Sequence, residues 1–211
     1  MIINWNDFKY ERILYRIFVT FQLIRTKYWY KLFLKKCGSN CLVMNPLYIS
    51  YSALELEDNV MIRNNCRIEA VRRYNEISYN PRIIFHKNVS IEQSLHLTSA
   101  KFIEIGSNTS ISANVTITDI NHPYIDISIP IEQQDITVDS VYIGDDCKIY
   151  NNAVILPGTK IGKHCVVGAN SVLSGEYPDY CIIVGAPAKI VKRYSFSTNE
   201  WINTSKKDVT T

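Results

Sequence analysis

Four histidines, His86, His96, His122 and His164, are the side chains of this 211-residue sequence best suited to acid–base chemistry near neutral pH. The motifs of several other chemistries are missing from the sequence. It has no G-x-S-x-G nucleophile elbow, no phosphate-binding G-x-x-x-x-G-K-[ST] loop, no G-x-G-x-x-G after a strand and no H-E-x-x-H zinc motif. With these motifs excluded, the four histidines remain to be weighed as candidate functional residues.

The four histidines differ in their local context. His86 and His164 fall at polar corners of a repeated pattern, where solvated side chains are expected. His96 closes a repeat unit and could line a corner. His122 stands where the regular pattern stops and a long irregular segment begins, in the run 118–123, TDINHP. Long excursions from a strict repeat are usually functional, so His122 is the strongest candidate although most loop histidines are ordinary.

A six-residue repeat between Ile143 and Leu173 predicts the elements that position these residues. An aliphatic residue opens each unit and a small residue follows four places later, in IGDDCK, IYNNAV, ILPGTK, IGKHCV and VGANSV. A helix would space its apolar residues by three or four, and a simple strand by two. A strict period of six is typical of a parallel β-helix, in which each unit is one short strand and a corner. The register recurs at 105–116 and, more loosely, at 56–67 and 85–96.

Composition and cysteine placement predict one solid, reduced domain. Hydrophobic residues make up 46% of the chain, yet no run of about 18 uncharged apolar residues could span a membrane. Cys66, Cys147 and Cys165 occupy the small inward position of a repeat, which indicates packing. Cys37 and Cys41 lack a second ligand pair for a metal. We expect a cytoplasmic protein without a secretory leader, a disulfide framework or a metal.

The net charge of +3 conceals an asymmetry. Residues 1–36 hold eight Lys and Arg against two acidic residues, and residues 5–35 hold ten aromatic residues at helical spacing. The repeat body has no basic stripe interleaved with aromatics, which argues against nucleic-acid binding. The N-terminal segment is expected to be a helix that caps the first edge strand, that contacts a membrane surface, or that does both.

The sequence divides into three regions. Residues 1–36 form the aromatic and basic helical segment. Residues 37–184 form the β-helix, which is interrupted at 71–82 and by a loop insertion at 120–139. Residues 185–211 form an exit segment and tail, in which Ser197 and Glu200 could start one helical turn.

These motifs together resemble the hexapeptide-repeat acyltransferases. The features that carry the resemblance are the repeats, the segment 111–117, the His122-Pro123 pair, the loop after it and the run 184–189, VGAPAK. Within that family the chain is most similar to galactoside, maltose and nodulation-factor O-acetyltransferases and to O-antigen and capsule O-acetyltransferases. The resemblance implies an all-β core folded as a left-handed parallel β-helix and a homotrimer with its active sites between neighbouring prisms. It also implies acetyl transfer from acetyl-CoA to a sugar hydroxyl of a bacterial surface polysaccharide.

The same resemblance assigns roles to particular residues. His122 falls at the family's general base, which takes the proton of the acceptor hydroxyl and passes it to the leaving thiolate. Asn114 and Asp119 could orient the imidazole or bind the acceptor, or they could satisfy turn backbone groups. Tyr124 could stack on a sugar ring. The positions carried over for coenzyme A are Asn151, Ala169, Ser174, Lys189 and Lys192.

Three alternatives remain open from the sequence. The acceptor could be an amine of an amino sugar or antibiotic rather than the hydroxyl of a glycan or of a nucleotide- or lipid-linked sugar. The γ-type carbonic anhydrases share the fold, but they need three converging histidines that this spacing does not supply. A non-catalytic β-helix could serve as a scaffold, although it would not need the His122-Pro123 loop.

Overall fold

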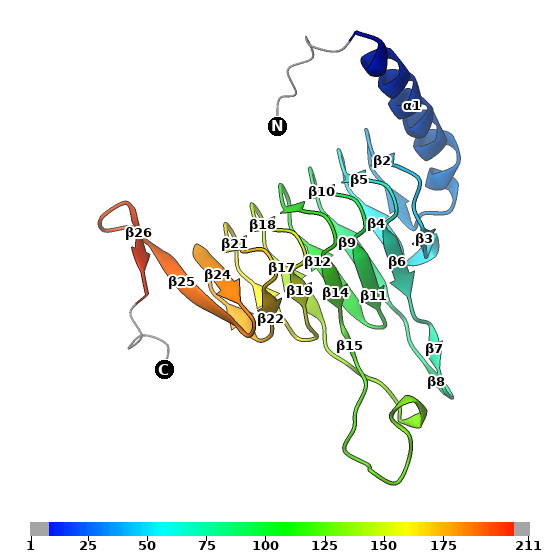
Figure 1. The fold of residues 1–211 in the computed structure, drawn as a ribbon. Helices are drawn as coiled ribbons and strands as arrows, with labels where there is room; N and C mark the ends of the chain where they lie inside the picture. The colour runs from blue at the N-terminus through cyan, green and yellow to red at the C-terminus, as the bar shows by residue number, and fades with distance from the viewer. Residues whose placement is uncertain (1–8, 205–211) are drawn as a thin grey trace.

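Three parallel β-sheets form the sides of a prism that is wound from stacked coils (Figure 1). The computed structural model describes residues 9–204. Sheet A contains β1 (Lys36–Cys37), β4 (Leu54–Leu56), β9 (Arg82–Phe85), β12 (Phe102–Ile105), β17 (Val141–Ile143), β20 (Lys160–Ile161) and β23 (Glu176–Tyr177). Sheet B contains β2 (Leu42–Val43), β5 (Met61–Ile62), β10 (Ser90–Ile91), β13 (Ser110–Ile111), β18 (Lys148–Ile149), β21 (Val166–Val167) and β24 (Cys181–Gly185). Sheet C contains β3 (Tyr48–Ile49), β6 (Arg67–Ala70), β11 (His96–Ser99), β14 (Thr116–Thr118), β19 (Val154–Ile155) and β22 (Val172–Leu173).

The core is a stack of aliphatic side chains that point into the prism. In sheet C, Ile68, Leu97 and Ile117 lie in register on successive coils and are fully buried. The hexapeptide period places each inward position above its counterpart on the coil below, so the same stacking recurs in sheets A and B. Cys147 and Cys165 are buried free thiols, and the backbone N–H of Cys165 donates to Cys147 Sγ at 3.4 Å. The predicted parallel β-helix and the small inward positions are both confirmed.

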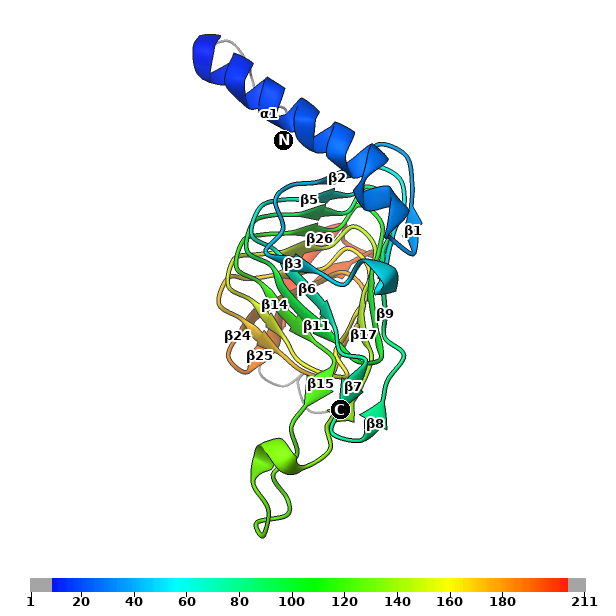
Figure 2. The same cartoon turned by 90° about the vertical axis from the view of Figure 1, so that its right-hand side faces the viewer.

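Both interruptions of the repeat leave the prism at the corner where sheet C passes into sheet A (Figures 1 and 2). The first forms a short antiparallel hairpin of β7 (Arg73–Tyr74) and β8 (Ile77–Ser78). The second begins and ends as an antiparallel pair, β15 (Ile120–Asn121) with β16 (Thr137–Val138), and contains the 3₁₀ turn η3 (Ile131–Gln133). The hairpin 71–82 and the loop insertion 120–139 therefore project from one corner.

The N-terminal segment packs against the first coil. It contains α1 (Lys9–Tyr28) and the 3₁₀ turn η1 (Tyr30–Leu32). The β-helix itself has a further 3₁₀ turn, η2 (Tyr51–Ala53), after β3. Thr26 Oγ1 accepts a hydrogen bond of 2.9 Å from the backbone N–H of Val43, so the capping role is confirmed. None of the helices within residues 9–204 is long and apolar enough to cross a membrane. Residues 1–8 of the predicted helical segment lie outside the described residues.

The predicted helical turn near the C-terminus is wrong. β25 (Ala188–Ser195) and β26 (Glu200–Asn203) instead continue sheet B as antiparallel strands. Asn199 adopts a left-handed φ of 57° in the connecting turn, and the rings of Tyr194 and Trp201 meet across the two strands at 5.5 Å. Cross-strand aromatic packing, which a single helical turn could not provide, stabilises this arrangement. Residues 205–211 are not described.

Candidate active site

A groove of about 380 Å³ lies at the corner from which the hairpin and the loop project. Neighbouring residues of a strand face opposite sides of the sheet, so the burial of Leu97 and Ile117 turns the residues beside them outward. The groove joins this outer face of sheet C to both inserted segments. It is lined by Val71, Tyr74, His96, Thr98, Thr116, Thr118, Ile120, His122 and Ile136.

His122 enters this groove directly after β15. Its side chain is 39% exposed, but its Nδ1 atom is buried and has no hydrogen-bond partner among the described residues. The nearest carboxylate oxygen, Glu132 Oε2, lies 3.9 Å from Nδ1. Catalytic hydrogen bonds are often long without substrate and shorten when it binds. The arrangement can therefore orient the imidazole through Nδ1 and leave Nε2 as the proton acceptor.

The hairpin holds Glu132 in place from the opposite side. The Tyr74 hydroxyl donates to the backbone oxygen of Glu132 at 2.8 Å and lies 3.1 Å from its carboxylate. The Tyr74 ring also meets the His122 ring edge-on, with centroids 5.5 Å apart. Asn75 Nδ2 donates to Gln133 O at 3.3 Å, and the Tyr79 hydroxyl donates to Ile136 O at 3.3 Å. The hairpin 71–82 therefore holds the loop insertion 120–139 in place through these hydrogen bonds.

Asp119 is buried beneath this corner and does not face the groove. Its carboxylate accepts hydrogen bonds from Ser99 Oγ at 2.6 Å and from the backbone N–H groups of Ala100, Lys101 and Phe102 at 2.7, 2.9 and 2.8 Å. Both oxygens are occupied by the tight turn between β11 and β12. A substrate contact for Asp119 is therefore contradicted, and the turn-satisfying role is the one observed.

Asn114 and Tyr124 are not among the residues that line the groove. Asn114 occupies the corner between sheets B and C with a left-handed φ of 59°, a conformation that Asn tolerates better than most residues. Tyr124 is 72% exposed on the loop insertion. Neither residue lines the groove around His122, so a role for either in acceptor binding stays a prediction.

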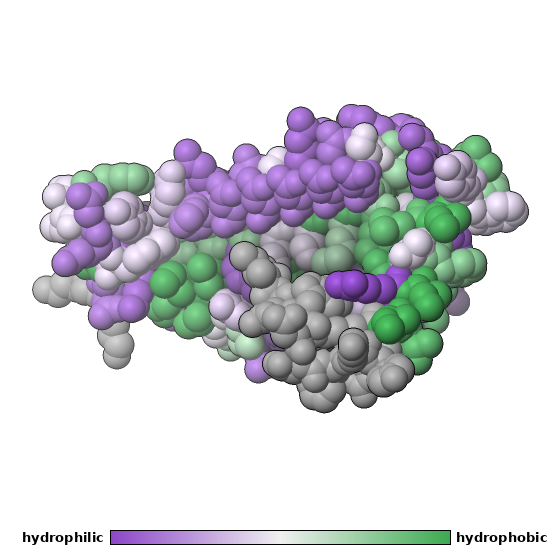
Figure 3. Space-filling view, turned by 90° about the horizontal axis from the view of Figure 1, so that it is seen from above, coloured by the Kyte–Doolittle hydropathy of each residue, from purple (hydrophilic) through white to green (hydrophobic). Residues whose placement is uncertain are grey.

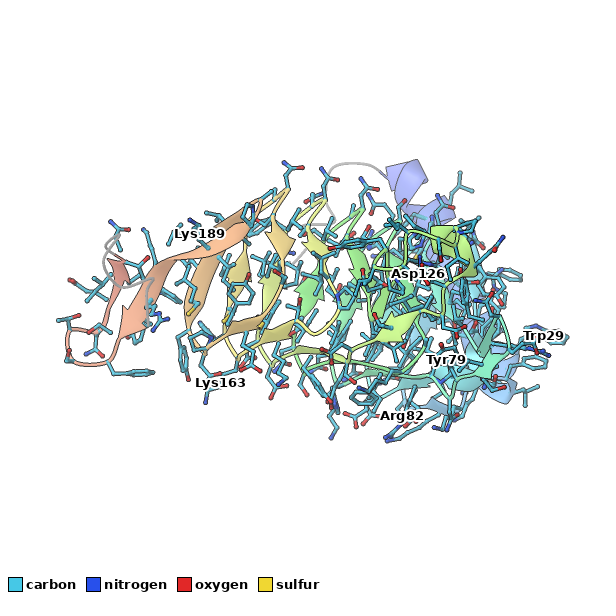
Figure 4. All side chains as sticks on the ribbon, turned by 90° about the horizontal axis from the view of Figure 1, so that it is seen from below. Trp29, Tyr79, Arg82, Asp126, Lys163 and Lys189 are labelled. Atoms are coloured by element: carbon cyan, nitrogen blue, oxygen red, sulfur yellow. The ribbon has the colours of Figure 1, made fainter. Side chains whose placement is uncertain are left out.

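The five positions carried over for coenzyme A lie at the C-terminal end of the prism. Asn151 and Ala169 are exposed on the sheet B to sheet C corner, where Asn151 O accepts from the backbone N–H of the next coil. Ser174 is exposed after β22, at the following corner. Lys189 and Lys192 lie on β25, opposite Val184 and Ile182 of β24. Figure 4 shows Lys189 at the end of the prism far from Trp29.

Sequence reasoning ranked His96 below His122 and missed two further residues of this site. His96 lines the groove from β11, directly beside Thr116 of β14, and the alternation of inward and outward residues could have raised its rank. Glu132 and Tyr74 were missed because their proximity to His122 depends on how two irregular segments fold against each other. No pattern in the sequence encodes that packing.

The other two histidines have different surroundings. His86 lies on sheet A between two carboxylates, with Nε2 2.6 Å from Glu104 and Nδ1 3.3 Å from Glu57. Burial opposes the charged form, but the hydrogen bonds that the imidazole donates to Glu104 and then Glu57 outweigh it and raise the pKa of His86. His164 occupies a left-handed corner position with φ 54°. In residues 9–204, no three His, Cys, Asp or Glu side chains converge to hold a metal.

Comparison with known proteins identifies the repeat. A family model described as bacterial transferase hexapeptide (six repeats) matches residues 140–175. A putative lipopolysaccharide biosynthesis O-acetyl transferase of Escherichia coli K12 is 38% identical over 126 residues, which are 56% of this chain and 64% of that protein. A probable acetyltransferase of Mycobacterium tuberculosis is 43% identical over 95 residues, 45% of this chain and 32% of the other. The chain thus spans about a third to just under two thirds of the length of these relatives.

Solved structures of two acyltransferases share the fold. An N-acyltransferase from Bacillus cereus, in complex with dTDP-4-amino-4,6-dideoxyglucose and coenzyme A, superimposes with a TM-score of 0.66. It is 17% identical, and the match covers 82% of this chain and 90% of that one. A maltose O-acetyltransferase from Clostridium difficile 630 gives a TM-score of 0.53 at 22% identity and covers 87% and 84%. The predicted left-handed parallel β-helix and the resemblance to hexapeptide-repeat proteins are confirmed.

Proposed function

We propose that this hexapeptide-repeat protein transfers an acetyl group from acetyl-CoA to a sugar hydroxyl of a bacterial surface polysaccharide, with His122 as the general base. The observation that carries the proposal is the placement of His122. Its imidazole enters a groove on the outer face of sheet C, with Nδ1 buried near a carboxylate. The similarity to a relative named as a lipopolysaccharide biosynthesis O-acetyl transferase supports the acceptor class.

The proposed reaction needs one proton carrier and no covalent enzyme intermediate. Nε2 of His122 accepts the hydroxyl proton while the acceptor oxygen attacks the thioester carbonyl carbon. The tetrahedral intermediate then collapses, the C–S bond breaks, and the imidazolium returns the proton to the leaving thiolate. Glu132, whose side chain is 79% exposed, is placed to accept a hydrogen bond from Nδ1–H when substrate binds, which would keep that tautomer and stabilise the imidazolium.

The donor must reach from the groove to the C-terminal end of the prism. Strand β13 lies on the same coil as β14, which lines the groove, and β24 is the last parallel strand of sheet B. The two strands are three strand spacings apart, which is about 14 Å along the axis of the prism. An extended molecule with a thioester at one end and phosphates at the other suits this geometry. Lys189 and Lys192 would then bind the phosphates, while Asn151, Ala169 and Ser174 would line the path of the pantetheine arm.

A second copy of the chain would complete the site, as in a homotrimer. The loop insertion carries Ile125 and Ile127, which are 87% and 98% exposed, and Tyr124 beside them. Large apolar side chains that are this exposed on one loop indicate burial against another surface. We infer that the loop of one copy packs on a neighbouring prism and closes its groove. An oligomer in solution, measured by sedimentation, is the corresponding expectation.

Release of free coenzyme A from acetyl-CoA tests the proposed function directly. The acceptor is de-O-acetylated surface glycan of the source organism, and a nucleotide-linked amino sugar serves as the competing acceptor. Release that depends on the glycan supports O-acetylation. Release with the amino sugar alone would favour N-acylation instead. Failure to bind acetyl-CoA at all would contradict the proposal and favour a scaffold.

Replacing Glu132 with alanine is expected to lower kcat by about three- to tenfold, because His122 loses the carboxylate 3.9 Å from Nδ1 that is placed to accept its hydrogen bond when substrate binds. KM for both substrates should stay unchanged, since Glu132 is placed behind the imidazole and not against substrate. Glu132→Gln should recover part of the loss, because its amide oxygen can still accept a hydrogen bond. Steady-state kinetics measure both parameters.

Glu76→Ala is the matched control for this experiment. Glu76 is an exposed carboxylate on the hairpin, paired only with Arg73 in the described structure. It should leave kcat unchanged. A rise in KM with constant kcat in Glu132→Ala would instead show that Glu132 binds substrate.

Replacing both Lys189 and Lys192 with alanine is expected to raise KM for acetyl-CoA by roughly three- to tenfold, because two charge-assisted phosphate contacts are lost near solvent. The effect should shrink as ionic strength rises. The control is Lys87→Ala with Lys163→Ala, two lysines at the sheet A to sheet B corner. An equal KM for acetyl-CoA in both double variants would show that the lysines of β25 do not bind the donor.

A further inference from the structure

The helix α1 turns its polar side chains toward the protein. Gln22 and Thr26 are almost completely buried against the first coil. Gln22 Nε2 and Arg25 Nη2 donate hydrogen bonds of 3.2 and 2.9 Å to Asn45 Oδ1. The inner face of α1 is therefore attached to the prism largely through hydrogen bonds.

The opposite face of α1 is apolar and uncovered. Ile17, Phe21, Ile24 and Tyr28 are spaced by four, three and four residues, so they form one stripe, and each is more than half exposed. A helix on the surface of a globular protein normally shows the reverse arrangement, with its apolar stripe against the core. The outer stripe is thus too large and too continuous to be explained by random exposure.

The apolar surface continues beyond the helix into η1. Trp29, Leu32 and Phe33 are all at least half exposed. Figure 3 shows hydrophobic patches gathered at the end of the molecule where α1 lies, and Figure 4 shows Trp29 pointing outward from that end. We call the stripe on α1 together with these three residues the outer apolar face.

Positive charge accompanies the outer apolar face. Residues 12–36 contain seven Lys and Arg and no acidic residue. Three of the seven face the β-helix instead: Arg25 bonds to Asn45, and Lys35 and Lys36 pair with Glu55 and Glu57. Lys27 and Lys31 are exposed, lie one turn apart and are adjacent in sequence to Tyr28 and Leu32. Lysines are depleted from the cores of protein interfaces, whereas an apolar stripe with flanking cations and aromatic rings is typical of helices that lie on lipid. The combination favours lipid over a second protein chain.

We propose that the outer apolar face docks on an anionic lipid surface, with α1 lying in the plane of the headgroups. Ile17, Phe21 and Ile24 enter the apolar boundary, while Lys27 and Lys31 contact lipid phosphates. The side chains of Tyr28 and Trp29 suit the headgroup level, where aromatic rings accumulate. This inference rests on the surface of the protein alone and does not depend on the acyl transfer proposed above.

Flotation of the full-length protein with vesicles tests the proposal. Vesicles of phosphatidylcholine with added phosphatidylglycerol should carry the protein to the top of the gradient, and pure phosphatidylcholine should carry much less. Ile17→Ser with Ile24→Ser should weaken binding by tenfold or more, since two large apolar side chains no longer leave water. The matched control is Ile77→Ser with Ile202→Ser, the same change at two exposed isoleucines away from α1 and outside the loop insertion.

The charge component has its own pair of variants. Lys27→Glu with Lys31→Glu should weaken binding to anionic vesicles by about fivefold or more for each lysine, and added salt should weaken the wild type similarly. Lys87→Glu with Lys163→Glu is the control. Wild-type protein that stays at the bottom of the gradient overturns the proposal. The proposal is also overturned if the Ile17→Ser, Ile24→Ser variant floats like the wild type but forms a smaller oligomer. That result would show that the outer apolar face binds a second copy of the chain.

Discussion

Replacing His122 with alanine is expected to lower the rate of acyl transfer by about 10²–10⁴-fold, because the acceptor hydroxyl loses the group that takes its proton. Binding of acetyl-CoA should be retained, since the residues assigned to its phosphates lie at the other end of the prism. The fold should be retained as well, because the His122 side chain is 39% exposed and makes no hydrogen bond with the described residues. Coenzyme A release and isothermal calorimetry separate the two effects.

His164→Asn is the matched control for His122→Ala. His164 adopts a left-handed conformation at a corner, and asparagine occupies the equivalent corners of other coils at Asn88 and Asn108. This variant should therefore keep both its structure and its activity. If His122→Ala transfers acetyl groups at the wild-type rate, His122 is not the base. His96, which lies in the same groove, would be the next histidine to replace.

Replacing Asp119 with alanine is expected to destabilise the protein by roughly 3–5 kcal/mol, because several hydrogen bonds to a buried carboxylate are lost together. Ser99 Oγ and the N–H groups of Ala100, Lys101 and Phe102 would lose their acceptor. Asp119 also lies immediately before β15, so the position of His122 should be disturbed and activity should fall in the variant that still folds. Thermal unfolding and coenzyme A release measure the two consequences.

Two further variants make the Asp119 result specific. Asp119→Asn keeps one acceptor oxygen but turns an NH₂ group toward backbone donors, so its loss of stability should be intermediate. Asp126→Ala removes an exposed carboxylate of the loop insertion, which accepts hydrogen bonds only from Ser128 among the described residues, and it should unfold at nearly the wild-type temperature. A wild-type unfolding temperature for Asp119→Ala would contradict the role assigned to its hydrogen bonds.

The repeat made most of the fold predictable. A period of six with an aliphatic residue at one fixed position allows only a structure in which each unit lies above another, and Ile68, Leu97 and Ile117 stack in that way. The C-terminal strands β25 and β26 broke the period, and there the local pattern of Ser197 and Glu200 wrongly indicated a helical turn. Pairing across strands is a non-local interaction, so short-range propensity could not predict it.

By itself the sequence determined the parallel β-helix, its corners, the loop insertion as a break in the repeat and His122 as the histidine where the repeat stops. These properties follow from local periodicity, which needs no knowledge of distant contacts. Only the tertiary structure decided that Asp119 serves the turn at 99–102, that Glu132 and Tyr74 lie beside the imidazole, and that α1 presents its apolar stripe outward. Each of these depends on how two segments far apart in the chain pack, and irregular segments and helix orientation leave no periodic pattern in the sequence.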